Sequence, residues 1–256
     1  MNINYQFFSK DQLTDDQMFT YRIDPLLPGE IDGVITDLIS VKGPAEIQEP
    51  SRNDIIDVIL TLDGAANISM STGEYKSRTN SVVRIPYESG YVLRVEGKHD
   101  FCCLRIRKSL EERDREVIEK EQVKYISHYA QPLSECKTYK EDIKSRKTTN
   151  RMILPEAKVP RLVIGSVETK GPDAVEAHEH PMLDQLFLGL DDCMCTIHAD
   201  GVQAVLREYT LLHIPLGSRH HAEVATGDLL SYIWMDFFLT LAGESYISDQ
   251  HIMEDD

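Results

Sequence analysis

The chain has 256 residues, of which 41% are hydrophobic and 27% charged, a composition typical of one large or two small globular domains. No stretch approaches the ~18 uninterrupted apolar residues of a membrane span, and the first residues lack the pattern of a secretory signal, so we expect a cytoplasmic protein. The 27 Lys and Arg residues against 43 Asp and Glu residues give a net charge of −16, which repels nucleic-acid phosphates. Five cysteines, an odd number, indicate reduced thiols.

An internal repeat organises the sequence. Residues 42–64 align without a gap on residues 170–192, sharing Lys-Gly-Pro at the start and Leu-x-Leu-Asp near the end. At nearly the same spacing, residues 82–92 align on residues 211–221 and share an Ile-Pro pair. Because two blocks match in the same order, we predict two copies of one structural unit.

Each copy consists of short apolar runs that end in turn residues. The first copy predicts strands at 57–64, 67–71, 82–85, 91–95 and 101–106, and the second at 185–192, 193–198, 211–214, 223–224 and 230–238. Strands at this spacing are typical of a sandwich or a barrel. We therefore predict an all-β chain of two tandem β-barrels.

One helix is predicted between the two copies, over residues 109–126. Ser109 is a candidate N-cap, and Glu112 three residues later completes a capping box. The polar and basic segment up to residue 150 has no clear period and is interpreted as a linker. The expected organisation is a first barrel over 1–108, a helix and linker over 109–150, and a second barrel over 151–256.

The second copy carries a histidine pattern that the first lacks. His178 and His180 are two residues apart, so they share one face of a strand. Gln185 follows with Asp184 beside it, and His220 comes just after a Pro-x-Gly turn. Three imidazoles and one oxygen ligand suit a divalent first-row metal such as Zn, Mn, Fe, Ni or Cu.

The spacing of these residues resembles that of the cupin superfamily, whose motifs are H-x-H-x(3,4)-E-x6-G and P-x-G-x2-H. The resemblance places His178, His180 and His220 on the family's histidine ligands and Gln185 on its glutamate. It implies a bicupin made of two jelly-roll-like barrels. The second barrel is expected to bind one divalent transition metal.

The first copy departs from the motif. Asp57 and Gly64 keep the E-x6-G frame, whereas Pro50, Arg52 and Tyr91 stand at the three histidine positions. The first barrel is therefore expected to be degenerate. In the second copy, Gln185 in place of glutamate makes the ligand set neutral, and this glutamine is equally suited to bonding a backbone group.

Further candidates lie on two other strands of the second copy. Tyr232, Trp234 and Asp236 share one face of the last strand. If that face looks into the barrel, Tyr232 and Trp234 line a substrate pocket and Asp236 is a candidate general base. His213 is a weaker pocket candidate, because Arg84 at the matching position of the first copy suggests an exterior or cavity-mouth site.

Three functions remain open on these residues. The first is a metal-dependent isomerase or lyase acting on a small oxygenated metabolite such as a sugar, sugar acid or keto acid, with Asp236 moving a proton. The second is a three-histidine dioxygenase, which needs a dry apolar pocket; candidate residues for it are Met182, Leu186, Leu188, Trp234 and Phe237. The third is a non-catalytic binding or regulatory protein. A homodimer is expected, because barrel edges favour pairing between subunits.

Overall fold

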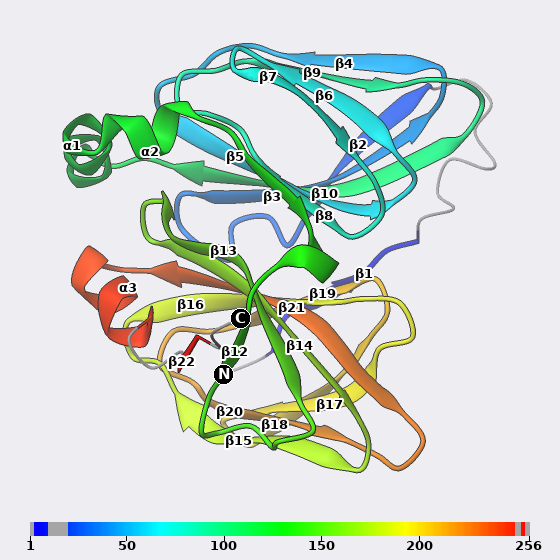
Figure 1. The fold of residues 1–256 in the computed structure, drawn as a ribbon. Helices are drawn as coiled ribbons and strands as arrows, with labels where there is room; N and C mark the ends of the chain where they lie inside the picture. Colours follow the sequence, from blue (N-terminus) through cyan, green and yellow to red (C-terminus); the bar gives the residue numbers. More distant parts are fainter. Residues whose placement is uncertain (1–2, 10–19, 249–251, 254–256) are drawn as a thin grey trace. The chain divides into compact units, whose positions relative to one another are not determined.

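The computed structural model describes residues 3–9, 20–248 and 252–253, and antiparallel strands make up most of it (Figure 1). The chain divides into two compact units. The first unit comprises Ser9–Glu135 and Ala157–Pro160, and the second comprises Met1–Phe8, Cys136–Glu156 and Arg161–Asp256. Each unit is a pair of sheets closed around its own apolar core, which confirms the predicted all-β double barrel.

The first unit pairs a six-stranded sheet with a four-stranded sheet. The larger sheet has the order β11-β8-β5-β10-β3-β2 and the smaller the order β4-β9-β6-β7. The strands are β2 (Tyr21–Leu26), β3 (Val34–Lys42), β4 (Ala45–Glu49), β5 (Ile55–Asp63), β6 (Ala66–Met70), β7 (Gly73–Ser77), β8 (Ser81–Arg84), β9 (Tyr91–Val95), β10 (Asp100–Ser109) and β11 (Tyr129–Pro132).

The second unit repeats this plan with an eight-stranded and a four-stranded sheet. Their orders are β1-β19-β16-β21-β14-β13-β12-β22 and β15-β20-β17-β18. The strands are β1 (Tyr5–Phe7), β12 (Thr138–Lys140), β13 (Thr149–Val159), β14 (Leu162–Lys170), β15 (Asp173–Glu179), β16 (Leu183–Gly189), β17 (Met194–Ala199), β18 (Val202–Arg207), β19 (Thr210–Ile214), β20 (Arg219–Val224), β21 (Leu229–Phe238) and β22 (Ile252–Met253).

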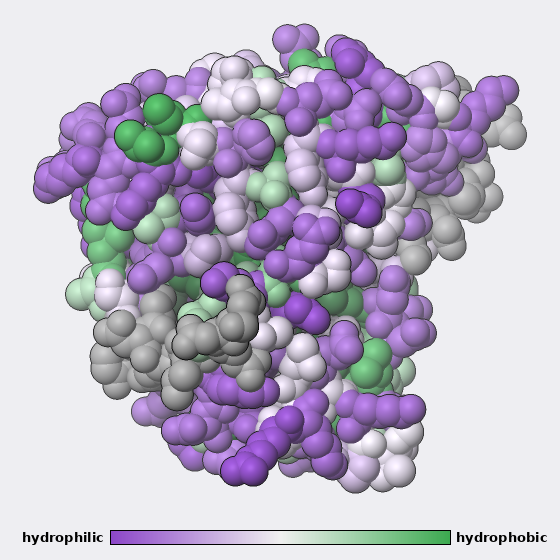
Figure 2. Space-filling view, in the orientation of Figure 1, coloured by the Kyte–Doolittle hydropathy of each residue, from purple (hydrophilic) through white to green (hydrophobic). Residues whose placement is uncertain are grey.

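Alternation along the strands of each unit explains where its core lies. In β16, Gln185 and Phe187 point into the barrel of the second unit, whereas Asp184 bonds outward to His213. Side chains on the two faces of a strand alternate with a period of two, so this one assignment fixes the facing of the whole strand. Figure 2 shows that hydrophilic residues cover most of the face in view, as expected of a chain with a net charge of −16.

The N-terminal segment does not belong to the first barrel as predicted. Strand β1 pairs antiparallel with β19 of the second unit, Tyr5 lying opposite Leu212. Phe8 follows it and is buried, with its ring 5.9 Å from that of Tyr209. The predicted range of 1–108 for the first barrel is therefore wrong at its start, because β1 adds to the sheet of the second unit beside β19, which follows some 200 residues later in the sequence.

The helical segment also begins later than predicted. Helix α1 spans Glu112–Lys120 and α2 spans Gln122–Ile126, followed by a short 3-10 helix at Leu133–Glu135. Ser109 is not an N-cap, because it is the last residue of β10 and pairs with Ile55. Instead the backbone N–H of Glu111 donates to the side chain of Asp114 at 2.9 Å, which closes the first turn of α1. A third helix, α3, spans Leu241–Ser248.

The predicted linker is largely structured. Strand β11 adds to β8 of the first unit, and β12 and β13 pair with each other in the second. The polar composition of this segment conceals these strands, because edge strands with one solvated face need few apolar residues.

Candidate metal centre

Three imidazoles converge inside the barrel of the second unit. His178 on β15 lies directly opposite His220 on β20, and His180 follows at the end of β15. The ladder shifts register between Val175 and His178, and such an irregularity re-aims the side chains that follow it. The ring centroids of His178 and His220 are 4.4 Å apart, and those of His178 and His180 are 4.8 Å apart. One nitrogen from each of the three rings lies within 4.8 Å of the others, so the group could hold a metal ion.

Backbone carbonyls set the tautomers of two of these histidines. Nδ1 of His178 donates to the carbonyl of Glu176 at 2.7 Å, and Nδ1 of His220 donates to the carbonyl of Ser218 at 3.0 Å. The proton on Nδ1 leaves Nε2 of each ring with a lone pair. Metal-binding histidines are commonly oriented in this way by a bond from their other nitrogen.

Burial keeps these two histidines neutral. It lowers the pKa of His178, and it lowers the pKa of His220 to about 3, with the neighbouring imidazole of His178 adding to the shift. Both rings are thus unprotonated at neutral pH, as metal coordination requires. Nε2 of His220 is buried and has no hydrogen-bond partner among the described residues, a costly arrangement that a bound cation would relieve.

Gln185 on β16 supplies an oxygen to the same pocket. Its Nε2 donates to Oδ1 of Asp236 at 2.8 Å, across the register pair that joins β16 to β21. Its Oε1 is buried and accepts no hydrogen bond from the described residues. Gln185 therefore does not bond a backbone group, and its free oxygen makes it a suitable fourth ligand.

Asp236 is deeply buried and has a raised pKa. It is only 3% exposed, and burial raises its pKa to about 7, although the hydrogen bond from Gln185 acts in the opposite direction. A carboxyl group with a pKa near neutrality can both take up and release a proton at physiological pH.

The histidines, Gln185 and Asp236 line one pocket of about 380 Å³, a volume that includes its open mouth. Tyr232 and Trp234 line it too, so this face of β21 looks into the barrel. The other lining residues are Glu141, Ile143, Lys144, Val175 and Phe187.

Sequence reasoning missed a charged pair in this pocket. Glu141 and Lys144 are joined by an ion pair of 2.5 Å, and Nζ of Lys144 also donates to the hydroxyl of Tyr139 at 3.1 Å. Both charged side chains are largely buried. The segment is held against β15, because the N–H of Glu176 donates to the carbonyl of Ile143 at 2.9 Å. No periodicity marks this segment, so only the three-dimensional pairing brings it to the site.

Two groups of candidates lie outside the pocket. His213 instead contacts Asp184, with Nε2 3.2 Å from Oδ1, on the outer face of its sheet. Leu186, Leu188 and Phe237 have the opposite strand parity to Gln185 and Asp236 and are absent from the pocket lining. The matching Arg84 of the first unit also faces outward, where its guanidinium donates to the carbonyls of Lys124 and Tyr125.

The equivalent interior of the first unit holds charges of a different kind. Pro50, Arg52, Asp57 and Tyr91 line a pocket there, as the repeat predicts for positions matching the metal ligands. Beside them, Arg105 is only 2% exposed.

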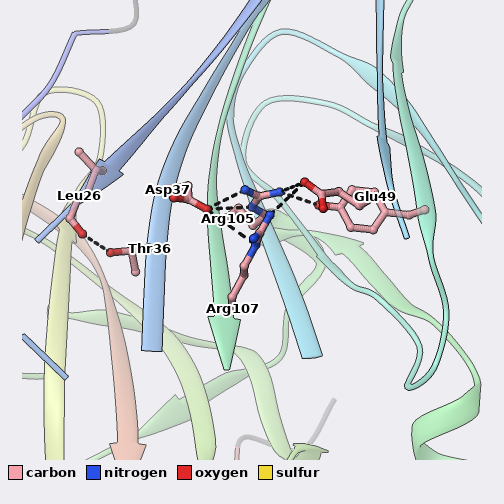
Figure 3. A network of polar contacts seen from close by, with 7 residues as sticks. Leu26, Thr36, Asp37, Glu49, Arg105 and Arg107 are labelled. Atoms are coloured by element: carbon pink, nitrogen blue, oxygen red, sulfur yellow. Dashed lines mark hydrogen bonds and ion pairs between the residues drawn. The ribbon is translucent and has the colours of Figure 1, made fainter. Parts of the chain in front are cut away.

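Arg105 lies between two carboxylates in a buried network (Figure 3). Its guanidinium bonds Asp37 at 2.7 Å and contacts Glu49, which also accepts from Arg107 at 2.9 Å. The carboxylates of Asp37 and Glu49 are thus already paired with guanidinium groups and are not free to ligate a cation. Among the described residues, the clusters that could hold a metal are confined to the second unit.

Comparisons with known proteins identify the fold. No family model matches the chain, and no curated protein resembles it in sequence. The "putative glyoxylate induced protein" from Pseudomonas aeruginosa has a similar structure, with a TM-score of 0.69, 8% identity and coverage of 84% of this chain and 80% of that one. A cupin 2 conserved barrel domain protein from Leptotrichia buccalis has a TM-score of 0.58 and 15% identity, with coverage of 85% of this chain and 88% of that one. An oxalate decarboxylase has a TM-score of 0.59 and 12% identity, with coverage of 86% of this chain and 74% of that one.

These similarities span both units. None of the described helices is long and apolar enough to cross a membrane. Two jelly-roll barrels joined in tandem, with a histidine cluster at the position expected for the second, give this chain the fold of a bicupin.

Proposed function

We propose that the second unit binds one divalent transition metal through His178, His180 and His220, with Oε1 of Gln185 as the fourth ligand. The observation that carries this proposal is a pair of buried atoms without hydrogen-bond partners among the described residues, Nε2 of His220 and Oε1 of Gln185, in one pocket. Nitrogen ligands with one neutral oxygen suit Zn, Mn, Fe, Ni or Cu better than Mg or Ca.

On this centre we propose a metal-dependent enzyme of isomerase or lyase type, acting on a small oxygenated metabolite such as a sugar, sugar acid or keto acid. The bound ion would supply a Lewis acid that polarises a substrate oxygen. Asp236 is the pocket group suited to holding and releasing a proton, because its pKa is about 7. Lys144 and Glu141 add charged groups that can orient polar substituents.

The facing of the apolar residues favours proton transfer over oxygen chemistry. A dioxygenase requires a dry apolar pocket, yet Leu186, Leu188 and Phe237 do not line this one. Beside the apolar residues Ile143, Val175, Phe187 and Trp234, its walls include the carboxyl of Asp236 and the ion pair of Glu141 with Lys144. The fold is compatible with lyase chemistry, since one of the similar structures is an oxalate decarboxylase.

We further propose that the chain is a cytoplasmic homodimer that binds neither nucleic acid nor membranes. The net charge of −16 supports the exclusion of nucleic acid. Strands β7 and β18 end their sheets in the described part of the chain, and such edges are suited to pairing between subunits. Light scattering coupled to size-exclusion chromatography tests the dimer, and a monomer at micromolar concentration would contradict it.

Elemental analysis of the tag-free protein tests the metal centre directly. We expect close to one tightly held equivalent of Zn or Mn, and its loss in a His178→Ala/His220→Ala variant. A His99→Ala/His128→Ala variant of the first unit is the matched control and should keep the metal. A screen of sugar and keto-acid isomers should then show turnover that Asp236→Asn abolishes.

Other outcomes separate the alternatives. Bound Fe, Ni or Cu together with substrate-dependent oxygen consumption would replace the isomerase proposal with a dioxygenase. If the parent after reconstitution holds no more metal than the His178→Ala/His220→Ala variant, the pocket binds none, which would overturn both enzyme proposals and leave a non-catalytic binding protein.

A further inference from the structure

A second group of potential ligands lies on the opposite face of the same small sheet. His198 on β17 is directly opposite His221 on β20, and Glu223 lies two residues further along β20. Strands β17 and β20 are neighbours in the four-stranded sheet (Figure 1). Because faces alternate along a strand, His221 and Glu223 point outward while the adjacent His220 points into the pocket.

The two outer imidazoles are stacked. Their ring centroids are 4.3 Å apart and the rings are within 3° of parallel. Because a metal binds in the plane of an imidazole, one ring has to turn about its Cβ–Cγ bond before both Nε2 atoms can reach one ion, and side-chain exposures of 28% and 31% leave room for that turn. The Nε2 atoms of both rings lie near the carboxylate of Glu223, each next to a different oxygen. Nε2 of His198 is 3.8 Å from Oε2 of Glu223, and Nε2 of His221 is 3.5 Å from Oε1.

These separations are too long for hydrogen bonds, which span 2.7–3.2 Å between heavy atoms. They are close to the spacing of two ligands on one ion. With metal–ligand bonds of about 2.0–2.1 Å and a tetrahedral angle, the N···O separation across Zn²⁺ is about 3.4 Å. One ligand atom from each of the three residues already lies within 4.8 Å of the others.

Polar satisfaction and access support the same interpretation. Nε2 of His198 is buried and has no hydrogen-bond partner among the described residues. The side chains of His198, His221 and Glu223 are nevertheless 28%, 31% and 60% exposed, so an ion can enter from solvent and keep water ligands. Two imidazoles and one carboxylate are ligands typical of Zn²⁺, Ni²⁺ or Cu²⁺.

We propose that His198, His221 and Glu223 form a second, solvent-facing site for a borderline divalent cation such as Zn²⁺. The ion would link β17 to β20 across their ladder. It would therefore stabilise the sheet whose inner face carries His178 and His220, without touching the pocket. This site does not depend on the proposed function of the pocket.

Zinc titration of metal-free full-length protein by calorimetry tests the site. We expect two equivalents in the parent and one in a His198→Ala/His221→Ala variant. Glu223→Gln, which keeps the shape of the side chain, should weaken the outer site at least about tenfold, the loss that even indirect changes cause at metal sites. Thr196→Ala, which alters the residue opposite Glu223 on β17, is the matched control and should bind as the parent does. Mg²⁺ should not bind at this site.

The pocket variant His178→Ala/His220→Ala separates the two proposals. If it binds one equivalent that His198→Ala/His221→Ala then removes, the outer site is established whatever the pocket does. If the outer variant folds, by circular dichroism, and binds Zn²⁺ with the stoichiometry and affinity of the parent, the outer site is overturned. If the pocket variant binds as many equivalents of Zn²⁺ as the parent while the outer variant binds fewer, the proposed metal centre of the pocket is overturned and the outer site is supported.

Discussion

Gly165 on β14 lies directly opposite Trp234 on β21, and a Cβ atom at Gly165 would come within 2.2 Å of Cζ2 of the indole. The indole therefore rests on bare backbone. At the equivalent ladder position of the first unit, Asp37 lies opposite Arg105. The same position thus holds an indole beside the candidate metal centre in one barrel and a buried ion pair in the other.

Gly165→Ala is expected to displace the indole from this contact. Overpacking of a filled core costs about 1–3 kcal/mol of unfolding free energy. Trp234 is the only tryptophan of the chain, so its fluorescence emission reports the displacement without interference. Ser166→Ala, one residue along β14, is the control and should leave emission unchanged. Identical emission and stability in the glycine variant would contradict the packing described here.

His220→Ala and Tyr91→Ala compare matching positions of the two barrels. Removing His220 should abolish most metal binding, because it deletes one of three imidazole ligands. Removing Tyr91, which is buried beside Arg105, should leave metal content unchanged but cost about 3–5 kcal/mol of stability, as large aromatic deletions do. Elemental analysis and urea unfolding measure the two effects. If both variants retain full metal content, the ligand assignment is wrong.

The pKa of Asp236 predicts how the stability of the metal-free protein depends on pH. The folded value of about 7 is above the ordinary value of 3.8, so the folded state binds the extra proton between these limits. This contribution to stability is complete below about pH 4 and is lost as the pH rises through 7. Asp236→Asn should therefore be more stable than the parent at pH 8, by about 1.4 kcal/mol for each unit of pKa shift.

Thermal unfolding at pH 5 and pH 8 measures this difference. The difference in stability between Asp236→Asn and the parent should become smaller as the pH is lowered towards 4. Glu168→Gln alters an exposed carboxylate on β14 and is the control. A constant difference between parent and Asp236→Asn across this range would show that the carboxyl is not perturbed.

The sequence was informative where local pattern and repeat agreed. The apolar runs that end at Asp63 and near Asp191 correspond to β5 and β16, and Tyr91–Val95 is β9 with the predicted bounds. The convergence of His178, His180 and His220 followed from motif spacing and the family resemblance. The pocket facing of Trp234 and Asp236 remained conditional, because parity alone does not say which face of a strand is inside.

Long-range pairing was beyond the sequence pattern. Nothing in residues 5–7 indicates a partner at Thr210–Leu212, and nothing in the polar run around Glu141 and Lys144 indicates a place in the pocket wall. The prediction that Ser109 caps the helix is wrong, because β10 continues through Ser109 and sheet pairing there overrides a local capping preference.

Gln185→Glu tests whether the neutral ligand set is functional. A glutamate lacks the N–H that bonds Asp236, so in the metal-free protein it would place two carboxyls together in a buried site, and one of them would have to keep a proton. A divalent ion would offset that repulsion and bind more tightly to the added charge. The variant should therefore unfold at a lower temperature than the parent when metal-free at pH 8, yet gain more on addition of Zn²⁺. Thermal unfolding with and without the ion measures both quantities, and the outer-site variant His198→Ala/His221→Ala provides the background that isolates the pocket. A variant that folds but gains nothing from Zn²⁺ would show that Gln185 serves to hold Asp236 and not a metal.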